Sequence, residues 1–344
     1  MRVLIIGGNK FIGPYVVQTL HKTGHEIILF NRGQTKHTFP FPVASIQGDR
    51  NDLTLFQNQL LAFHPDIVID MIPYTERNAE QVGNIFHGKV KRVVIISSCD
   101  VYQAYDRLWN VTTDQLISTP LKEQSALRDN FYPYRKILSA KSGDWGYDYE
   151  KILVENTIRS YVDLNSTILR LPMVYGPGDH SRIYPYLKRI DDARPILLDE
   201  NKANWRSSRG YVEDMANAVV LAALDTRTGN RIYNVAEKEM YSELEWINRI
   251  AEITGKRYEI KELPHEKLPE HLQEPLAWEQ DLTLDTQSIR DELNYKELYS
   301  SEIALQKSID WLRTQKPDNI DDRSFNYDAE DIALAEACTR TLRL

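Results

Sequence analysis

A tyrosine and a lysine stand four positions apart in the stretch YDYEKILVE, residues 147–155. On a helix, Tyr147 and Lys151 would share one face. A phenol has a pKa near ~10, and a neighbouring ammonium group lowers that pKa because it favours the phenolate. Such a tyrosine can exchange a proton with a substrate hydroxyl while a nicotinamide takes or gives a hydride. Ser98, in the stretch VVIISSCDVY, is the candidate to hold the substrate oxygen in line. The pattern predicts Ser98, Tyr147 and Lys151 as a catalytic set.

Two other tyrosines compete for the acid/base role. Tyr132 and Lys136 have the same spacing, but Pro133 lies between them and disfavours a helix interior. Tyr149 lies two residues before Lys151, which places it on a different helix face. We therefore assign the role to Tyr147 and keep Tyr149 and Tyr132 as alternatives. A tyrosine that packs in the core is the alternative for each of them.

The first half of the chain alternates β-branched runs with amphipathic stretches, which predicts a parallel sheet buried on both faces. The expected strands are Val3–Ile6, Glu26–Phe30, Ala44–Gln47, Ile67–Met71, Arg92–Ser97, Ser166–Leu171 and a late strand at Arg231–Val235. The expected helices between and after them are Pro14–Thr23, Asp52–Phe63, Arg77–His87, Tyr147–Val162, Ser242–Thr254 and Ser301–Thr314, with helical spacing again at Asp328–Thr339.

A glycine-rich loop, GGNKFIG, separates the first strand from the first helix. Gly7 permits a tight turn, Gly13 lets the helix pack against the strand, and backbone N–H groups at the helix start can hold a pyrophosphate. A tight turn without a ligand is the alternative. Lys10 occupies the position where the dinucleotide fingerprint has its middle glycine.

The end of the second expected strand, Phe30-Asn31-Arg32-Gly33, bears on the choice of cofactor. NAD-binding folds usually place an acid there, which bonds the ribose 2′-hydroxyl. No acid is present, and Arg32 and Lys10 are suited to a 2′-phosphate. We therefore predict NADP as the cofactor, with NAD as the alternative. If neither cofactor binds, Arg32 and Lys10 are solvated surface charges. Asp49 is a candidate to bond the adenine amino group or to cap the helix that follows.

These motifs, in this order, resemble the extended short-chain dehydrogenase/reductase family, the NAD-dependent epimerase/dehydratase type. GGxxFIG opens the chain, ISSxxVY is similar to the strand-5 motif, and YxxxKxxxE matches at Tyr147, Lys151 and Glu155. LRLPMVYGPGD (residues 169–179), RGYVEDMANAVVLAAL and IYNVAE look like later family segments. Lys10 departs as in the branch that includes the chloroplast stem-loop-binding proteins.

The resemblance implies a Rossmann-type doubly wound α/β fold with a smaller C-terminal substrate-binding domain. Residues 1–172, with 208–236 returning to the sheet, form the expected dinucleotide-binding domain; residues 173–207 and 237–344 form the expected substrate domain. The expected cofactor contacts are Gly7, Gly8, Asn9, Lys10, Phe11, Ile12, Gly13, Asn31, Arg32, Asp49, Arg50, Lys151 and Pro172. The candidate substrate contacts are Asp100, Tyr102, Tyr175, Arg206 and Arg209.

The residues after Ser98 separate the reactions of the family. Its dehydratases carry Asp and Glu there, whereas this chain has Cys99 and Asp100, so dehydration is disfavoured. Cys99 is interpreted as a buried filler, because no basic residue adjoins it in sequence. We expect a reductase or an epimerase that acts on a nucleotide sugar or a similar carbonyl or hydroxyl substrate, and a homodimer. The segment 104–145 is longer than the family usually shows and is interpreted as a lid or a dimer contact.

Composition excludes several other classes. The chain has 344 residues, a net charge of −8 and no apolar run long enough to span a bilayer, which argues against a general nucleic-acid or membrane surface. Two cysteines and no signal-peptide pattern predict a cytoplasmic protein without a disulfide framework. The histidines show no metal-ligand spacing, so no metal site is expected. The alternative function is a catalytically idle binding protein, for RNA or for redox sensing, on the same fold.

Overall fold

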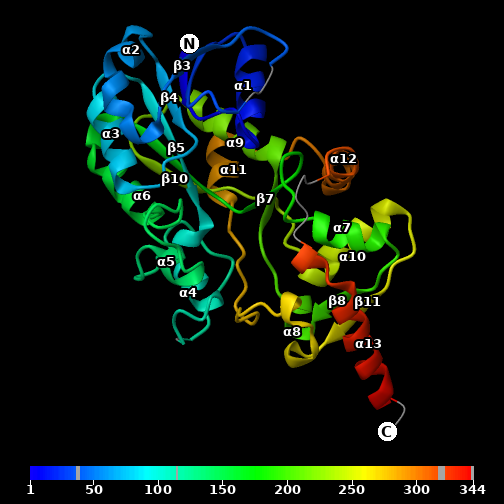
Figure 1. Cartoon of the computed structure of the whole chain (residues 1–344). Coiled ribbons are helices and arrows are strands. Elements are labelled where there is room, and N and C mark those ends of the chain that lie inside the picture. Colours follow the sequence, from blue (N-terminus) through cyan, green and yellow to red (C-terminus); the bar gives the residue numbers. More distant parts are fainter. Residues whose placement is uncertain (36–38, 114, 317–321, 342–344) are drawn as a thin grey trace.

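Seven parallel strands form the central sheet in the computed structural model, which describes residues 1–35, 39–113, 115–316 and 322–341 (Figure 1). Their order across the sheet is β10-β6-β5-β4-β1-β2-β3. The strands span Arg2–Ile6 (β1), Glu26–Asn31 (β2), Ala44–Gln47 (β3), Ile67–Asp70 (β4), Arg92–Ser98 (β5), Ser166–Leu171 (β6) and Arg231–Asn234 (β10). Strand β1 is flanked by β2 and β4: strands β2 and β3 follow on one side of it, and strands β4, β5, β6 and β10 follow on the other. The predicted doubly wound α/β fold is confirmed.

Helices cover both faces of this sheet, and each face has its own apolar core. On one face, α1 (Ile12–Lys22) packs against α9 (Val212–Leu224) over the alternate side chains of β1, β2 and β4. On the other face, α3 (Glu76–Phe86) packs against α6 (Lys151–Ser160), with the 3₁₀ helix η1 (Arg50–Phe56) and α2 (Gln57–Ala62) beside them. Strands buried on both sides explain why their sequences are continuously apolar.

The predicted elements are present, and several of their ends lie at other residues than predicted. The expected helix 52–63 is a 3₁₀ helix followed by the short α2, and the Asp49 side chain caps η1 by accepting from the Asn51 N–H at 2.8 Å. Strand β4 ends at Asp70 rather than at Met71. The expected helix 147–162 begins only at Lys151. Gly24, with φ of 78°, follows the end of α1, where a glycine adopts this conformation without strain.

The later chain builds a second region beside the sheet (Figure 1). Short parallel pairs join β7 (Met173–Tyr175) to β9 (Arg209–Tyr211) and β8 (Ile196–Asp199) to β11 (Ile260–Leu263). The helices of this region are α7 (Tyr184–Asp191), α8 (Glu200–Asn204), α10 (Glu243–Thr254), α12 (Ser301–Thr314) and α13 (Tyr327–Thr341). The remaining elements are η2 (Cys99–Val101), α4 (Gln103–Leu108), α5 (Pro133–Ile137), η3 (Val162–Leu164), η4 (His265–Lys267), η5 (Glu270–Leu272), α11 (Gln287–Leu293) and η6 (Asp322–Phe325).

Helix α13 docks on this second region through one buried carboxylate. Glu330, which is 1% exposed, accepts from the Arg189 guanidinium of α7 at 2.6 Å and contacts His271 Nε2 at 3.1 Å. The neighbouring pair between Arg194 and Asp331 lies at the surface. A buried ion pair depends on both partners, because removal of one leaves an uncompensated charge.

We expect Glu330→Ala to lower the free energy of unfolding by about 3–5 kcal/mol, because Arg189 then stays buried without its carboxylate. Urea unfolding followed by circular dichroism measures the change. Asp331→Ala is the matched control, since it removes only an exposed partner one residue away, and it should leave the urea midpoint unchanged. Equal effects of the two substitutions would contradict the buried docking of α13.

Candidate functional site

The glycine loop between β1 and α1 has the conformation that a close ligand approach requires. Gly7 and Gly8 have φ of 93° and 94°, which side chains rarely adopt. A Cβ on Gly13 would lie 2.4 Å from the Gly8 Cα, so only glycine fits there. Helix α1 begins at Ile12, and no side chain caps its first N–H groups. The Gly13 N–H donates to the Lys10 carbonyl at 3.0 Å, and the other N–H groups of the first turn are available to an anion.

A cavity of about 420 Å³ opens over this loop at the carboxyl ends of the strands. Its lining residues are Gly7, Gly8, Asn9, Lys10, Phe11, Ile12, Phe30, Asn31, Arg32, Gly33, Gln34, Thr35, Gly48, Arg50, Met71, Ile72, Tyr74 and Ile96. Three of these side chains are cations and none is a carboxylate. Lys10 and Arg32 are exposed, so their charges are free to meet an anionic ligand. The cavity is therefore electrically suited to phosphate groups.

Arg50, the third cation, is held by the protein itself. Its guanidinium donates to Asp70 on β4, to the Gln81 side chain at 3.1 Å and to the Asn78 carbonyl at 2.8 Å. Arg50 and Asp70 are both buried, so the charges neutralise each other. Arg50 lines the cavity, so its expected contact with the cofactor stays a prediction, while its charge is already paired with Asp70. Asp49 lies outside the lining residues and serves as the cap of η1.

Lys151 joins the cavity to the predicted catalytic residues. It is the first residue of α6, is 3% exposed, and donates from Nζ to the carbonyls of Pro73 at 2.8 Å and Ile96 at 2.9 Å. Burial lowers the pKa of this ammonium group to about 8. Ile96 lines the cavity, and so does Tyr74, whose ring centroid lies 5.1 Å from Nζ. The lysine therefore contacts two residues that line the cavity, although it is not itself a lining residue.

The structure separates Tyr147 from Lys151. Because α6 begins at Lys151, the expectation that the two side chains share a helix face is wrong. The Arg135 guanidinium lies over the Tyr147 ring, with the arginine Cζ 4.1 Å from the ring centroid. Tyr132, the other alternative, has φ of 56° at the start of α5, and its ring contacts the same arginine.

Tyr149 is the tyrosine that lies beside Lys151. Its ring centroid is 5.4 Å from the Lys151 Nζ, and its hydroxyl donates to Asp100 Oδ2 at 2.8 Å. Ser98 ends β5, and a hydrogen bond with its side chain lowers the pKa of the Tyr149 phenol. Burial and the Asp100 charge act more strongly and raise that pKa well above its usual value. Tyr149 therefore holds its proton at neutral pH.

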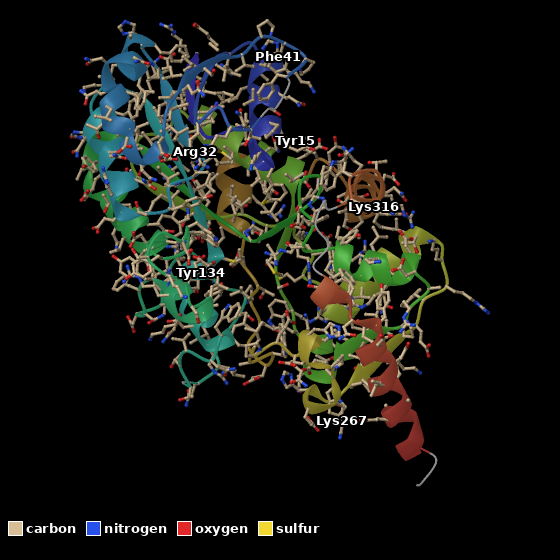
Figure 2. All side chains as sticks on the ribbon, in the orientation of Figure 1. Tyr15, Arg32, Phe41, Tyr134, Lys267 and Lys316 are labelled. Atoms are coloured by element: carbon tan, nitrogen blue, oxygen red, sulfur yellow. The ribbon has the colours of Figure 1, made fainter. Side chains whose placement is uncertain are left out.

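Aromatic rings surround the Tyr149 phenol. The rings of Tyr74, Tyr134 and Trp145 lie 5.9, 4.9 and 5.8 Å from it, centroid to centroid (Tyr134 is labelled in Figure 2). Trp145 is 62% exposed, so the cluster reaches the surface. Such rings desolvate the phenol, which is the main cause of its raised pKa.

A buried ion pair that the sequence motifs do not reveal fixes the start of α6. Arg128 and Glu150 form two parallel hydrogen bonds, at 2.8 and 2.9 Å, and neither side chain is exposed. Glu150 also accepts from the Ile152 and Tyr132 N–H groups, and Arg128 Nε donates to the Asp100 carbonyl at 2.7 Å. The pair thus connects η2, the segment before α5, and the residue between Tyr149 and Lys151.

Most of the predicted substrate contacts are occupied by the protein. The Tyr102 hydroxyl bonds Asn234 and accepts from Arg170, and Tyr175 is buried against Tyr211 and Trp246. These two tyrosines belong to the interior, so the expectation that they meet substrate is wrong. Asp100 is 2% exposed, but its Oδ1 lacks a partner within the described residues.

The two candidate arginines are paired with glutamates. Arg209 is buried and forms an ion pair with Glu243, with its guanidinium 4.6 Å from the Trp246 ring. Arg206 is exposed and pairs with Glu245. Arg209 is therefore held by the protein interior, whereas the exposed Arg206 stays a candidate substrate contact.

Other conspicuous residues of the motifs are structural. Glu155 accepts from Arg170 through two nitrogens and from the Ser97 hydroxyl, so the last residue of YxxxKxxxE builds a buried network. Burial raises the pKa of the Cys99 thiol to about 12, which agrees with its interpretation as an inert filler. Pro172 is buried between β6 and β7. No cluster of metal ligands occurs in the parts of the chain that the structure describes.

The long segment 104–145 packs along the C-terminal chain. The Leu108 carbonyl accepts from Ala277, Ile117 exchanges hydrogen bonds with Gln280, and Leu121 bridges to Leu284. Residue 114 lies outside the described residues.

Among the described residues, no helix combines the length and the hydrophobicity that a membrane-spanning segment requires.

Comparison with known proteins agrees with this architecture. The sequence profile of the NAD dependent epimerase/dehydratase family matches residues 3–236, so the chain belongs to that family. A UDP-N-acetyl-alpha-D-glucosaminuronate decarboxylase from Bacillus cytotoxicus is 24% identical over 91% of this chain and 98% of its own. Chloroplast stem-loop binding protein of 41 kDa b from Arabidopsis thaliana is 26% identical over 68% of this chain and 58% of its own.

Solved structures show the same fold. MoeE5 in complex with UDP-glucose and NAD superimposes with a TM-score of 0.65 at 19% identity, over 91% of this chain and 99% of its own. UDP-glucose 4-epimerase from Thermotoga maritima, with UDP-glucose, gives a TM-score of 0.66 at 17% identity over 91% and 99%.

We expect Glu150→Ala to destabilise the protein by about 3–5 kcal/mol, because the Arg128 guanidinium stays buried without its carboxylate. The start of α6 should loosen with it. Thermal unfolding and hydrogen exchange of the 149–153 amides measure the two effects. Asp148→Ala, which removes an exposed partner of Arg135 two residues away, should change neither. Unchanged exchange in Glu150→Ala would show that the ion pair does not position the helix start.

Proposed function

We propose that this chain is a nicotinamide-dinucleotide-dependent oxidoreductase or epimerase that acts on a hydroxyl or carbonyl group of a small molecule. One observation carries the proposal: the cation-lined cavity over the glycine loop shares Tyr74 and Ile96 with the surroundings of Lys151. A dinucleotide in that cavity would therefore end beside Lys151, Tyr149 and Ser98. Family membership supports the same reaction class.

The residues of the cavity fit a dinucleotide. Gly7, Gly8 and Gly13 leave room for backbone approach, and the uncapped start of α1 offers N–H groups to a pyrophosphate. Lys10 and Arg32 supply two exposed cations, which favours NADP over NAD because a 2′-phosphate adds negative charge. The solved structures of similar fold are described with NAD, so NAD remains the alternative. When bound, the nicotinamide supplies or accepts the hydride.

We assign the proton at the reacting oxygen to Tyr149, with Ser98 beside it. The raised pKa keeps the phenol protonated, so it is suited to donate a proton to a carbonyl oxygen as that oxygen gains charge. Lys151 has three N–H donors and uses two on carbonyls, which leaves one for a ribose hydroxyl or for the phenol. Tyr147 keeps this role as the alternative, through a local rearrangement of residues 145–150.

A nucleotide sugar is the substrate class that relatives support. The names of the decarboxylase from Bacillus cytotoxicus and of the UDP-glucose complexes each include a UDP-linked sugar. A reductase that acts on another carbonyl is the alternative, as in the 2'-dehydrokanamycin reductase of Streptomyces kanamyceticus, which is 23% identical over 80% of this chain. Dehydration stays disfavoured, because the buried Cys99 thiol cannot supply an acid at that position.

Fluorescence titration with NADPH and NADH tests the cofactor. We expect Arg32→Ala to weaken NADPH binding by about 10- to 150-fold, because a charge-assisted contact with phosphate contributes roughly 1.5–3 kcal/mol, and to leave NADH binding within about twofold. Arg77→Ala is the control, since Arg77 is an exposed cation outside the cavity lining. Equal loss for both nucleotides would remove Arg32 from the 2′-phosphate.

Turnover of UDP-glucose and UDP-glucuronic acid, with nicotinamide absorbance and sugar analysis as readouts, tests the catalytic residue. Tyr149→Phe should lower kcat by about 10²–10⁴-fold, because it removes the proton donor, while cofactor binding is kept. Tyr147→Phe is the matched comparison and should have a small effect. The opposite ranking would return the role to Tyr147. Cofactor binding without turnover of any sugar or carbonyl would favour an idle binding protein.

A further inference from the structure

Behind Tyr149 lies a cluster of hydroxyl groups that the proposed reaction has not yet used. Asp100 Oδ2 accepts from the Tyr149 hydroxyl at 2.8 Å and from the Tyr134 hydroxyl at 3.1 Å. Tyr134 in turn accepts from the Tyr105 hydroxyl at 3.4 Å. The four groups come from η2, α4, α5 and the segment before α6. They form a continuous chain of oxygen atoms that starts at the proposed acid.

The Asp100 carboxyl group is buried without a cation bonded to it. Arg128 passes close by, but its guanidinium is used by Glu150 and by the carbonyls of Asp100 and Asn130. Oδ1 has no partner within the described residues. Burial of a carboxylate costs free energy when its hydrogen-bond partners are only neutral hydroxyl groups. This cost shifts the Asp100 carboxyl group toward its protonated form. The raised pKa of Asp100 agrees with this balance, in which burial outweighs Arg128, Tyr149, Lys151 and Tyr134.

The outer end of the chain is closer to solvent than the inner end. Tyr149 and Asp100 are 6% and 2% exposed, whereas Tyr105 and Tyr134 are only partly buried. Solvent therefore lies nearer to Tyr105 and Tyr134 than to Asp100, and neither of these two tyrosines lines the cofactor cavity.

We propose that Asp100 and Tyr134 form a proton relay that reprotonates Tyr149 after each reduction, and that Tyr105 feeds it. This inference rests on the proposed function. When the Tyr149 Oη–H bond breaks and its proton goes to the substrate oxygen, Asp100 gives its proton to Oη. Tyr134 then gives its proton to Asp100 and takes one from Tyr105, which recovers a proton from water. The net change is one proton moved from solvent to the substrate oxygen, and the reverse direction serves oxidation.

Infrared difference spectra test the coupling without any substrate. Wild type minus Asp100→Asn should show the carbonyl band of a protonated carboxyl group, which fades as pH rises. Tyr134→Phe should move that midpoint upward by about one pH unit, because it removes a hydrogen bond that favours the carboxylate. Asp106→Asn is the control. Asp106 is also buried and lies near Arg128. Burial raises the pKa of the Asp106 carboxyl group to about 6, but Asp106 bonds none of these tyrosines. An unmoved midpoint in Tyr134→Phe would overturn the relay.

The second arm uses turnover of the UDP-sugar that the wild type accepts. Asp100→Asn and Tyr134→Phe should lower kcat about 10-fold or more and change its pH profile, with KM and cofactor affinity unchanged. Asp106→Asn should keep the wild-type profile. A pH profile that none of these substitutions alters would overturn the relay and leave the proposed function intact. Coupled infrared signals without turnover would overturn the proposed function, and the relay role with it.

Discussion

The hydrogen-bonded ion pair between Arg128 and Glu150 is the interaction on which the geometry of the site depends. Both side chains are fully buried, and each carboxylate oxygen accepts one guanidinium and one backbone N–H. Such a pair is stable only when all of its hydrogen bonds form, because burial has removed the hydration of both charges. Glu150 therefore defines where α6 begins. The residues on either side of it, Tyr149 and Lys151, take their positions from that fixed point.

The central fold could be predicted from the sequence because each of its signals is local. Runs such as Val3–Ile6 and Arg92–Ser98 are apolar on both faces, and the glycine loop stands between the first strand and the first helix. Parallel strands need helical crossovers, so this alternation leaves few architectures. The late strand at Arg231 was also predicted, and the structure pairs it with β6.

The tyrosine that lies beside Lys151 could not be predicted from spacing alone. A four-residue interval places two side chains on one face only where the helix already exists, and the helix start here is set by Arg128, 22 positions before its partner. Sequence reasoning assigned three further residues to the substrate for a related reason: Tyr102, Tyr175 and Arg209. Their polar atoms or rings are satisfied by distant residues such as Asn234, Trp246 and Glu243, and residue type does not reveal whether a polar side chain faces a ligand or another part of the chain.

Strand order along the chain has a consequence for biosynthesis. Strand β6 is buried over its whole length, yet its outer neighbour β10 lies some sixty residues further along, after the first part of the second region. While the ribosome adds residues 172–230, the apolar edge of β6 has no partner strand. Unpaired apolar edges invite association with other chains, and large α/β proteins are exposed to this during synthesis. The nascent chain is therefore most vulnerable to aggregation in that interval, when the other six strands of the central sheet have already been synthesised.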